Sequence, residues 1–204
     1  IAHFAEARGY FMSKEWFNEN FEVMLSRETI ESRTKELAEK ISAEYSTEGV
    51  VAVGILRGCF MFFSELIKNM NCPTQVDFMY VSSYGDAATS SGVVKIEKDL
   101  QTNIAGRHVL LIDDIIDSGL TLHNLREMLM VRKPKSIKIC TLLDKKVPRK
   151  IAVEADYKAF DVENYFVVGF GLDYKQFFRN MNFIGKLKDG RQDELDRLIE
   201  STTS

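Results

Sequence analysis

Three carboxylates and a short polar loop follow one apolar run, and they carry the most evident chemistry in the sequence. The run is Val109 to Ile112, and Asp113, Asp114 and Asp117 come soon after it. The loop that follows consists of Ser118, Gly119, Leu120 and Thr121. Backbone N–H groups at the start of a helix, with hydroxyl side chains beside them, form a cradle for phosphate. The loop is therefore a candidate phosphate site, in which Gly119 lets the backbone approach the ligand closely.

The acids beside this loop would repel a phosphate unless a cation or a sugar lay between them. Ribose hydroxyls donate hydrogen bonds to carboxylates, and Mg²⁺ binds oxygen ligands. Adjacent residues of a strand point to opposite faces, so Asp113 and Asp114 do not simply duplicate each other. The segment therefore predicts a phosphorylated sugar bound together with magnesium. A strand followed by solvated acids explains two adjacent aspartates, but not the whole pattern from Val109 to Thr121.

Apolar runs and helical periodicity alternate along the chain in the order typical of a parallel α/β sheet. We expect strands at residues 22–25, 50–55, 76–80, 93–97, 109–112 and 136–143, and helices at 26–45, at 60–70, around Leu122, Leu125 and Leu129, and at 190–200. The small polar stretch 82–92 is expected to be a mobile loop. Strand–helix–strand order places helices on both faces of the sheet, and ligands then bind at the carboxyl ends of the strands.

The composition favours one globular domain, with a small appendage, that binds neither nucleic acid nor a membrane. The chain has 204 residues and a net charge of −3, so no basic excess points to a polyanion. No apolar run is long enough to cross a bilayer, and residues 1–11 lack the pattern of a secretion signal. The three cysteines lack metal or CxxC spacing, which predicts reduced thiols and a cytoplasmic location. No GxxxxGK[ST] motif is present, which argues against a P-loop hydrolase.

The segment Val109 to Thr121 closely resembles the phosphoribosyl pyrophosphate (PRPP) motif of the type I phosphoribosyltransferases. In that family the two leading acids engage the ribose hydroxyls, and the loop after them binds the 5′-phosphate. The resemblance implies that Asp113 and Asp114 bind ribose and magnesium, and that Asp117 is the general base. Many relatives have glutamate at the position of Asp113, so this chain keeps the charge and shortens the reach. The implied fold is a parallel sheet core flanked by helices, with a small hood subdomain.

Two further segments resemble the hypoxanthine-guanine branch of that family. Leu56, Arg57 and Gly58 match the loop that binds pyrophosphate through backbone amides, often with a cis peptide bond before the basic residue. Ser83 and Tyr84 match the mobile catalytic lid, which would close over the sugar and exclude water. Taken alone, the first segment is an ordinary strand-to-helix turn and the second an ordinary surface loop.

The purine side of the resemblance lies later in the chain. Lys145 matches the lysine that donates to the purine 6-oxo group, a role that suits an ammonium because it has donors only. Phe166 matches the aromatic residue that stacks on the purine, and Val167 the backbone group that bonds the ring edge. Asp173 matches a ligand of the second magnesium ion, and Arg179 the arginine that contacts pyrophosphate. The shared order of these residues behind the acidic motif favours the resemblance over five unrelated surface or core positions.

The resemblance implies an enzyme of purine salvage. PRPP and a 6-oxopurine base, hypoxanthine or guanine, would give IMP or GMP and pyrophosphate, and acceptance of xanthine stays open. The implied domain of core and hood spans residues 22–187, between an N-terminal extension at 1–21 and a helical tail at 188–204. A homodimer or homotetramer is also implied.

Three other interpretations stay open at this point. A transferase that uses PRPP with adenine, orotate or uracil is one, and Lys145 and the Phe166 segment argue against it. A nucleotide-sensing regulator on the same fold is the second, and the net charge of −3 does not support its RNA binding. A phosphate-receiver domain is the third, and the phosphate loop directly after the acids fits it poorly.

Overall fold

The computed structural model describes residues 14–83, 94–149, 151 and 153–203. This part of the chain forms two compact units. The larger unit lies within residues 28–164, and the smaller one combines residues up to 27 with those from 165 onward. Among the described residues, no helix is both long and apolar enough to cross a membrane.

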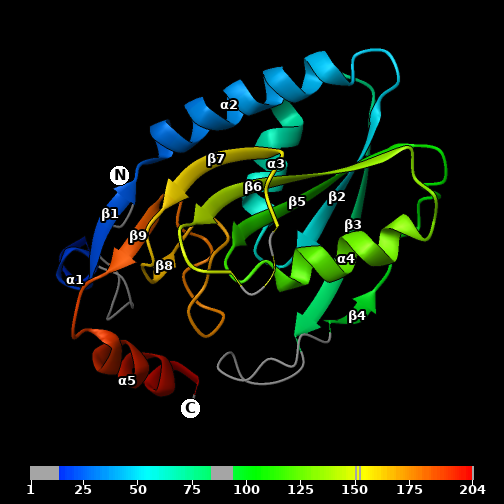
Figure 1. The fold of residues 1–204 in the computed structure, drawn as a ribbon. Coiled ribbons are helices and arrows are strands. Elements are labelled where there is room, and N and C mark those ends of the chain that lie inside the picture. The colour runs from blue at the N-terminus through cyan, green and yellow to red at the C-terminus, as the bar shows by residue number, and fades with distance from the viewer. Residues whose placement is uncertain (1–13, 84–93, 150, 152, 204) are drawn as a thin grey trace. The chain divides into compact units, whose positions relative to one another are not determined.

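The larger unit is built on a six-stranded sheet with the strand order β4-β3-β2-β5-β6-β7 (Figure 1). Neighbouring strands are parallel, except that β4 is antiparallel to β3. The strands are β2 (Val50–Leu56), β3 (Thr74–Ser83), β4 (Val94–Lys98), β5 (His108–Ile116), β6 (Ser136–Lys145) and β7 (Tyr157–Val162). The helices are α2 (Arg27–Glu44), α3 (Phe60–Asn69) and α4 (Leu120–Met130). The predicted α/β class with a mostly parallel sheet is confirmed.

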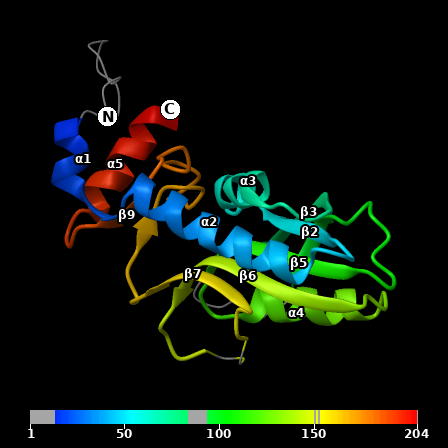
Figure 2. The same ribbon diagram turned by 90° about the horizontal axis from the view of Figure 1, so that it is seen from above.

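The two faces of this sheet bury different helices because side chains alternate along each strand. On one face, Gly54 of β2 lies so close to α3 that a Cβ there would be 2.9 Å from the Phe63 ring. On the other face, Leu125 of α4 packs in one apolar cluster with Val53 and Leu111. Figure 2 shows α4 on the opposite side of the sheet from α2 and α3. Covering both faces explains why the central strands are continuous apolar runs rather than alternating ones.

The smaller unit is a three-stranded antiparallel sheet with the order β1-β9-β8 and two helices. Its elements are α1 (Lys14–Asn20), β1 (Phe21–Leu25), β8 (Val167–Val168), β9 (Ile184–Leu187) and α5 (Gln192–Thr203). Aromatic rings fill its core. The rings of Phe17 and Phe21 stack at 5.1 Å, and Trp16 lies parallel to Phe178 at 6.1 Å. These contacts join α1 to the segment that follows β8.

Most predicted elements are present, with shifted ends. The strand expected at 109–112 continues to Ile116, so Asp113 and Asp114 lie inside β5 rather than after it. The strand expected at 93–97 is β4, which returns antiparallel to β3. The sequence did not indicate α1, β7, β8 or β9. β8 and β9 are only two and four residues long, and β7 carries charged residues at a sheet edge. These three strands therefore give no clear apolar signal. Most of the expected loop at 82–92 lies outside the described residues.

Candidate active site

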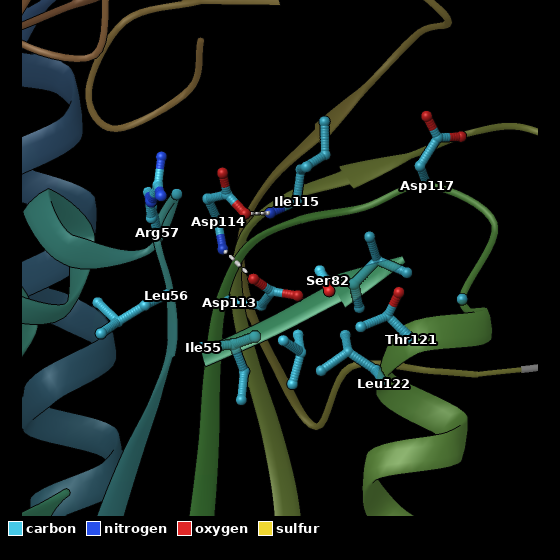
Figure 3. A pocket seen from close by; sticks show the side chains of 14 residues that line it. Ile55, Leu56, Arg57, Ser82, Asp113, Asp114, Ile115, Asp117, Thr121 and Leu122 are labelled. Carbon is cyan, nitrogen blue, oxygen red and sulfur yellow. Dashed lines mark hydrogen bonds between the residues drawn. The ribbon is translucent and has the colours of Figure 1, made fainter. Parts of the chain in front are cut away.

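A pocket of about 240 Å³ lies at the carboxyl ends of β2, β3 and β5, beside the start of α4 (Figure 3). Residues 55–58, 81, 82, 113–117, 119, 121 and 122 line it. All of them belong to the larger unit. Three segments predicted to bind different parts of one ligand therefore meet at one place. The place is also the end of the sheet at which α/β proteins bind ligands.

Asp113 and Asp114 are consecutive residues near the end of β5, with Asp114 above Asp113 in Figure 3, and each carboxylate accepts a hydrogen bond from the next backbone N–H. The Asp114 amide donates to Asp113 and the Ile115 amide to Asp114, both at 3.0 Å. Asp113 is buried, with 9% of its surface exposed. Burial, and then the charge of Asp114, raise the pKa of the Asp113 carboxyl well above its usual value. The pair therefore favours a ligand that supplies positive charge or hydroxyl donors.

The chemistry of these two carboxylates is compatible with the predicted magnesium and ribose ligands. Mg²⁺ in nucleotide enzymes is bound by one or two protein carboxylates, with waters and substrate oxygens completing the octahedron. Among residues 14–83, 94–149 and 153–203, no three histidine, cysteine, aspartate or glutamate side chains form a metal-binding group. Asp113 and Asp114 thus suit an ion that arrives with a phosphorylated substrate, since a dedicated protein cage needs more ligands.

The loop after β2 lies directly against Asp114. The peptide bond between Leu56 and Arg57 is cis, as the resemblance implied. A Cβ on Gly58 would lie 1.8 Å from the Asp114 carboxylate oxygen, so either the acid or the loop would have to move. The Arg57 guanidinium lies over the Tyr80 ring, 5.2 Å from its centroid. The neighbouring acid therefore favours glycine at position 58, a reason that the sequence did not reveal.

The start of α4 forms the predicted phosphate loop. Gly119 is its N-cap residue and has a φ of +77°, a conformation in which only glycine is unstrained. The Ser118 hydroxyl accepts a hydrogen bond from the Leu120 amide at 3.4 Å. Gly119 and Thr121 line the pocket, whereas Ser118 and Leu120 are not among its lining residues. We expected Gly119 for its close approach to a phosphate, and the backbone conformation supplies a second reason.

Asp117 and Lys145 form an ion pair, although 28 positions separate them in the sequence. Lys145 Nζ lies 3.1 Å from Asp117 Oδ2. The aspartate side chain is 60% exposed, and the lysine side chain is 13% exposed. Lys145 is the last residue of β6, and Asp117 comes directly after β5. Neighbouring parallel strands thus bring the predicted general base and the predicted purine-reading lysine together.

The predicted lid cannot be compared with the structure. Tyr84 and the side chain of Ser83 lie outside the described residues. Ser82 lines the pocket at the end of β3, and its hydroxyl donates to Glu97 of β4 at 3.1 Å. The antiparallel pair of β3 and β4 therefore supports both ends of the segment that contains the predicted lid.

The smaller unit contains the other predicted purine and pyrophosphate residues. Phe166 is 46% exposed and meets the Tyr174 ring edge-on at 5.2 Å, and Val167 begins β8. Arg179 Nη2 lies 2.7 Å from Asp173 Oδ1, and its Nη1 donates to the Gly171 carbonyl at 2.8 Å. The predicted magnesium ligand and the predicted pyrophosphate arginine are therefore partners of each other.

Backbone strain is concentrated around those residues. Phe170, Lys175, Gln176 and Phe178 all have positive φ values, between 48° and 74°. Such conformations cost free energy outside glycine and gather at ligand-binding segments. This strain supports including the segment in the candidate site, and a single sequence carries no sign of it.

Comparisons with known proteins agree with this geometry. Residues 24–175 match the family model described as a phosphoribosyl transferase domain. The chain is 49% identical over 166 residues to a hypoxanthine-guanine phosphoribosyltransferase of Bacillus subtilis (strain 168), covering 81% of this chain and 92% of the relative. It is 46% identical over 172 residues to the enzyme of the same name from Streptococcus agalactiae, covering 84% of this chain and 96% of the relative. A solved hypoxanthine phosphoribosyltransferase from Staphylococcus aureus has a TM-score of 0.82 and 43% identity, over 87% of this chain and 97% of that one.

Proposed function

The chain belongs to the phosphoribosyltransferase family, and from that premise we propose how its own residues carry out the transfer. It is a purine-salvage enzyme: it transfers the 5-phosphoribosyl group from PRPP to N9 of hypoxanthine or guanine, giving IMP or GMP and pyrophosphate. The observation that carries the residue assignment is the pocket at the end of β5. There the acid pair, the loop after β2 and the start of α4 line one cavity.

PRPP binds along that pocket. The residues from Ser118 to Thr121 bind its 5′-phosphate, because the N–H groups at the start of α4 donate hydrogen bonds to an anion. Asp113 and Asp114 accept the ribose hydroxyls. The backbone amides from Leu56 to Gly58 and the Arg57 guanidinium bind the pyrophosphate, with Arg179. Residues Ser83 and Tyr84 belong to the lid that excludes water from the sugar.

The carboxylates also supply the charge that the reaction needs. As pyrophosphate leaves C1 of the ribose, positive charge develops on the sugar. Asp113 and Asp114, fixed by backbone hydrogen bonds at 3.0 Å, provide negative potential beside it without reorganisation. Mg²⁺ bound by Asp113 and Asp114 would neutralise charge on the departing pyrophosphate, and Asp173 would bind a second Mg²⁺ ion.

The purine is bound by its ring and its edge. Phe166 stacks on the ring, and the Val167 backbone bonds the pyrimidine edge. Lys145 donates to the 6-oxo group, and this selects against a 6-amino group because an ammonium cannot accept a hydrogen bond. Asp117 takes the N7 proton as N9 attacks. The ion pair of Asp117 and Lys145 supports this division, since N7 and O6 lie on the same edge of a purine.

Domain boundaries, assembly and location are part of the same proposal. Residues 22–187 form the catalytic domain of core and hood, and the enzyme works as a homodimer or homotetramer. The cysteines Cys59, Cys72 and Cys140 are free thiols, which supports a reducing, cytoplasmic compartment.

The test offers four bases separately. The protein is mixed with Mg²⁺ and PRPP, and nucleotide and pyrophosphate are followed with hypoxanthine, guanine, xanthine or adenine. Turnover with hypoxanthine and guanine and none with adenine is expected, and the xanthine arm defines the remaining specificity. PRPP binding without turnover of any base would leave the sugar site in place and contradict the purine assignment, favouring a nucleotide-sensing regulator.

A further inference from the structure

The Arg149 side chain binds the backbone at the end of β6, where Lys145 lies, and at the end of β5, which Asp117 directly follows. Its Nε donates to the Asp117 carbonyl oxygen at 3.3 Å. Its Nη2 donates to the carbonyl oxygens of Ile116 at 3.5 Å and of Lys145 at 3.2 Å. Its Nη1 donates to the Val153 carbonyl oxygen at 2.5 Å. One guanidinium therefore joins four backbone oxygens from three separate segments.

A carboxylate keeps this guanidinium in place. Arg149 Nη2 forms an ion pair with Asp144 Oδ1, and the two side chains are only 14% and 13% exposed. The other Asp144 oxygen lies 3.2 Å from Lys158 Nζ. Arginine is planar and has five donors in a fixed fork, so a paired and largely buried arginine holds one orientation. The carbonyl oxygens bound to it are then fixed as well.

Arg149 contacts the backbone where the pairing of β5 and β6 ends. The last register pair between β5 and β6 joins Ile116 to Asp144. Asp117 lies one residue beyond it. The β5–β6 ladder therefore does not fix the backbone from which the Asp117 side chain projects, whereas the contact from Arg149 Nε does.

The reaction needs that control because N7 and O6 are adjacent atoms on one edge of the purine. A base for N7 and a donor for O6 must therefore lie side by side at a fixed separation, and misplacement by about 1 Å can cost about 100-fold in rate. Resting on the roles given above to Asp117 and Lys145, we propose that Arg149 is a positioning residue. It sets the separation of the Asp117 carboxylate and the Lys145 ammonium, and so the fit of the 6-oxopurine edge.

The main test is Arg149→Lys. Lysine keeps the positive charge for Asp144, but one ammonium cannot reach the carbonyl oxygens of both strand ends. We expect the KM for hypoxanthine to rise and kcat to fall, so that kcat/KM falls about 10-fold to 100-fold. The dissociation constant of PRPP, measured by calorimetry on the free enzyme, should change much less than the KM for hypoxanthine, since Arg149 donates hydrogen bonds only to Ile116 and Asp117 among the described residues that line the pocket.

The matched control is Lys158→Met. It removes the other cation from Asp144, and the contacts of Asp117 and Lys145 stay as they are. This variant should keep the wild-type kcat and the wild-type KM for hypoxanthine. Equal losses in R149K and K158M would overturn the proposal, because both effects would then come from the Asp144 ion pairs.

The remaining outcomes separate positioning from a role in stability alone. If Arg149 served stability alone, its substitution would lower the melting temperature and the active fraction of the enzyme. The apparent kcat would then fall while the KM for hypoxanthine and the KM for PRPP stayed unchanged, and that result would overturn the proposal. Arg149→Gln, whose amide can donate to two carbonyls at most, should give the same split as R149K. Failure of both variants to fold would also overturn it, since Arg149 would then serve the whole fold. Wild-type protein without turnover would contradict the proposed function instead.

Discussion

The amino and carboxyl ends of the central sheet both carry many ionisable groups, but they arrange them in opposite ways. At the amino end, Lys138 of β6 forms an ion pair with Glu44 at the end of α2, and Lys135 forms one with Glu48. The contacts of Lys138 and Tyr157 hold the pKa of Glu44 below its usual value. Both lysines at this end thus have an acidic partner. Partly exposed ion pairs of this kind contribute little to stability, and their charge is balanced without a ligand.

At the carboxyl end, like charges lie together. Asp113 and Asp114 are adjacent and partly buried, and the pKa of Asp113 is raised where that of Glu44 is lowered. Gly58 brings a loop backbone against the same acids. Such an arrangement is unfavourable until a substrate supplies hydroxyl donors or a cation. The difference shows that paired charge serves the fold, while unbalanced charge marks the place where a ligand is needed.

The largest effect is expected for Asp117→Asn. The amide keeps the shape of the side chain but cannot accept the purine N7 proton, so kcat should fall by about 10²-fold to 10⁴-fold. The affinity for IMP, measured by calorimetry, should change little. Wild-type turnover in this variant would remove Asp117 from the role of base. It would also weaken the comparison, because an acid at the functional end would then be dispensable.

Lys145→Ala should produce the next largest loss. Removing the donor to the 6-oxo group should lower kcat/KM for hypoxanthine by about 10-fold to 100-fold, while the dissociation constant of PRPP stays nearly constant. The neighbouring Lys146→Ala is the matched control. Lys146 is exposed and lies 3.6 Å from Glu163, so its loss should leave both constants unchanged. Equal damage to base use and to PRPP binding in K145A would contradict a purine-reading role.

Gly58→Ala should weaken PRPP binding. The new Cβ would overlap the Asp114 carboxylate, so either the loop or the acid must move. We expect a fall in PRPP affinity of about 10-fold, equivalent to about 1.4 kcal/mol, as measured by calorimetry. Gly106→Ala is the control, because it strains a φ of +70° in open space away from the pocket. It should reduce the melting temperature and leave the affinity of folded protein intact.

The smallest effect should come from the amino end, with Glu44→Gln. We expect unchanged turnover and a decrease in unfolding free energy of no more than about 1 kcal/mol at neutral pH. The folded-state pKa of Glu44 is lowered, so its contribution is present above the unfolded pKa and is lost as the pH falls through the folded pKa. Chemical denaturation at several pH values should show the two proteins converging in acid. A large loss of turnover would break the contrast between the two ends.

The strands of the larger unit other than β7 could be predicted because local signals determine them. The apolar runs at 50–55 and 136–143 mark buried strands. The residue types from Val109 to Thr121 indicate a phosphorylated sugar with magnesium, and the resemblance to the phosphoribosyltransferases narrows this ligand to PRPP. The pairing of Asp117 with Lys145 and the contacts of Arg149 depend on how neighbouring strands are placed. No residue near position 149 indicates that its partners lie at positions 116 and 117. The preference for glycine at position 58 is likewise set by an acid 56 positions away.

The antiparallel pairing of β4 with β3 bears on aggregation through the edge of the sheet. β4 is the outermost strand on its side of the sheet, and an outer strand offers unpaired backbone groups to any other chain. Here the strand is only five residues long, and Lys95, Glu97 and Lys98 along it are exposed. Adding a foreign strand there would require crowding and desolvating those charges. The short, charged edge strand thus disfavours edge-to-edge aggregation, and it belongs to the same β3–β4 pair that supports the segment with the predicted lid.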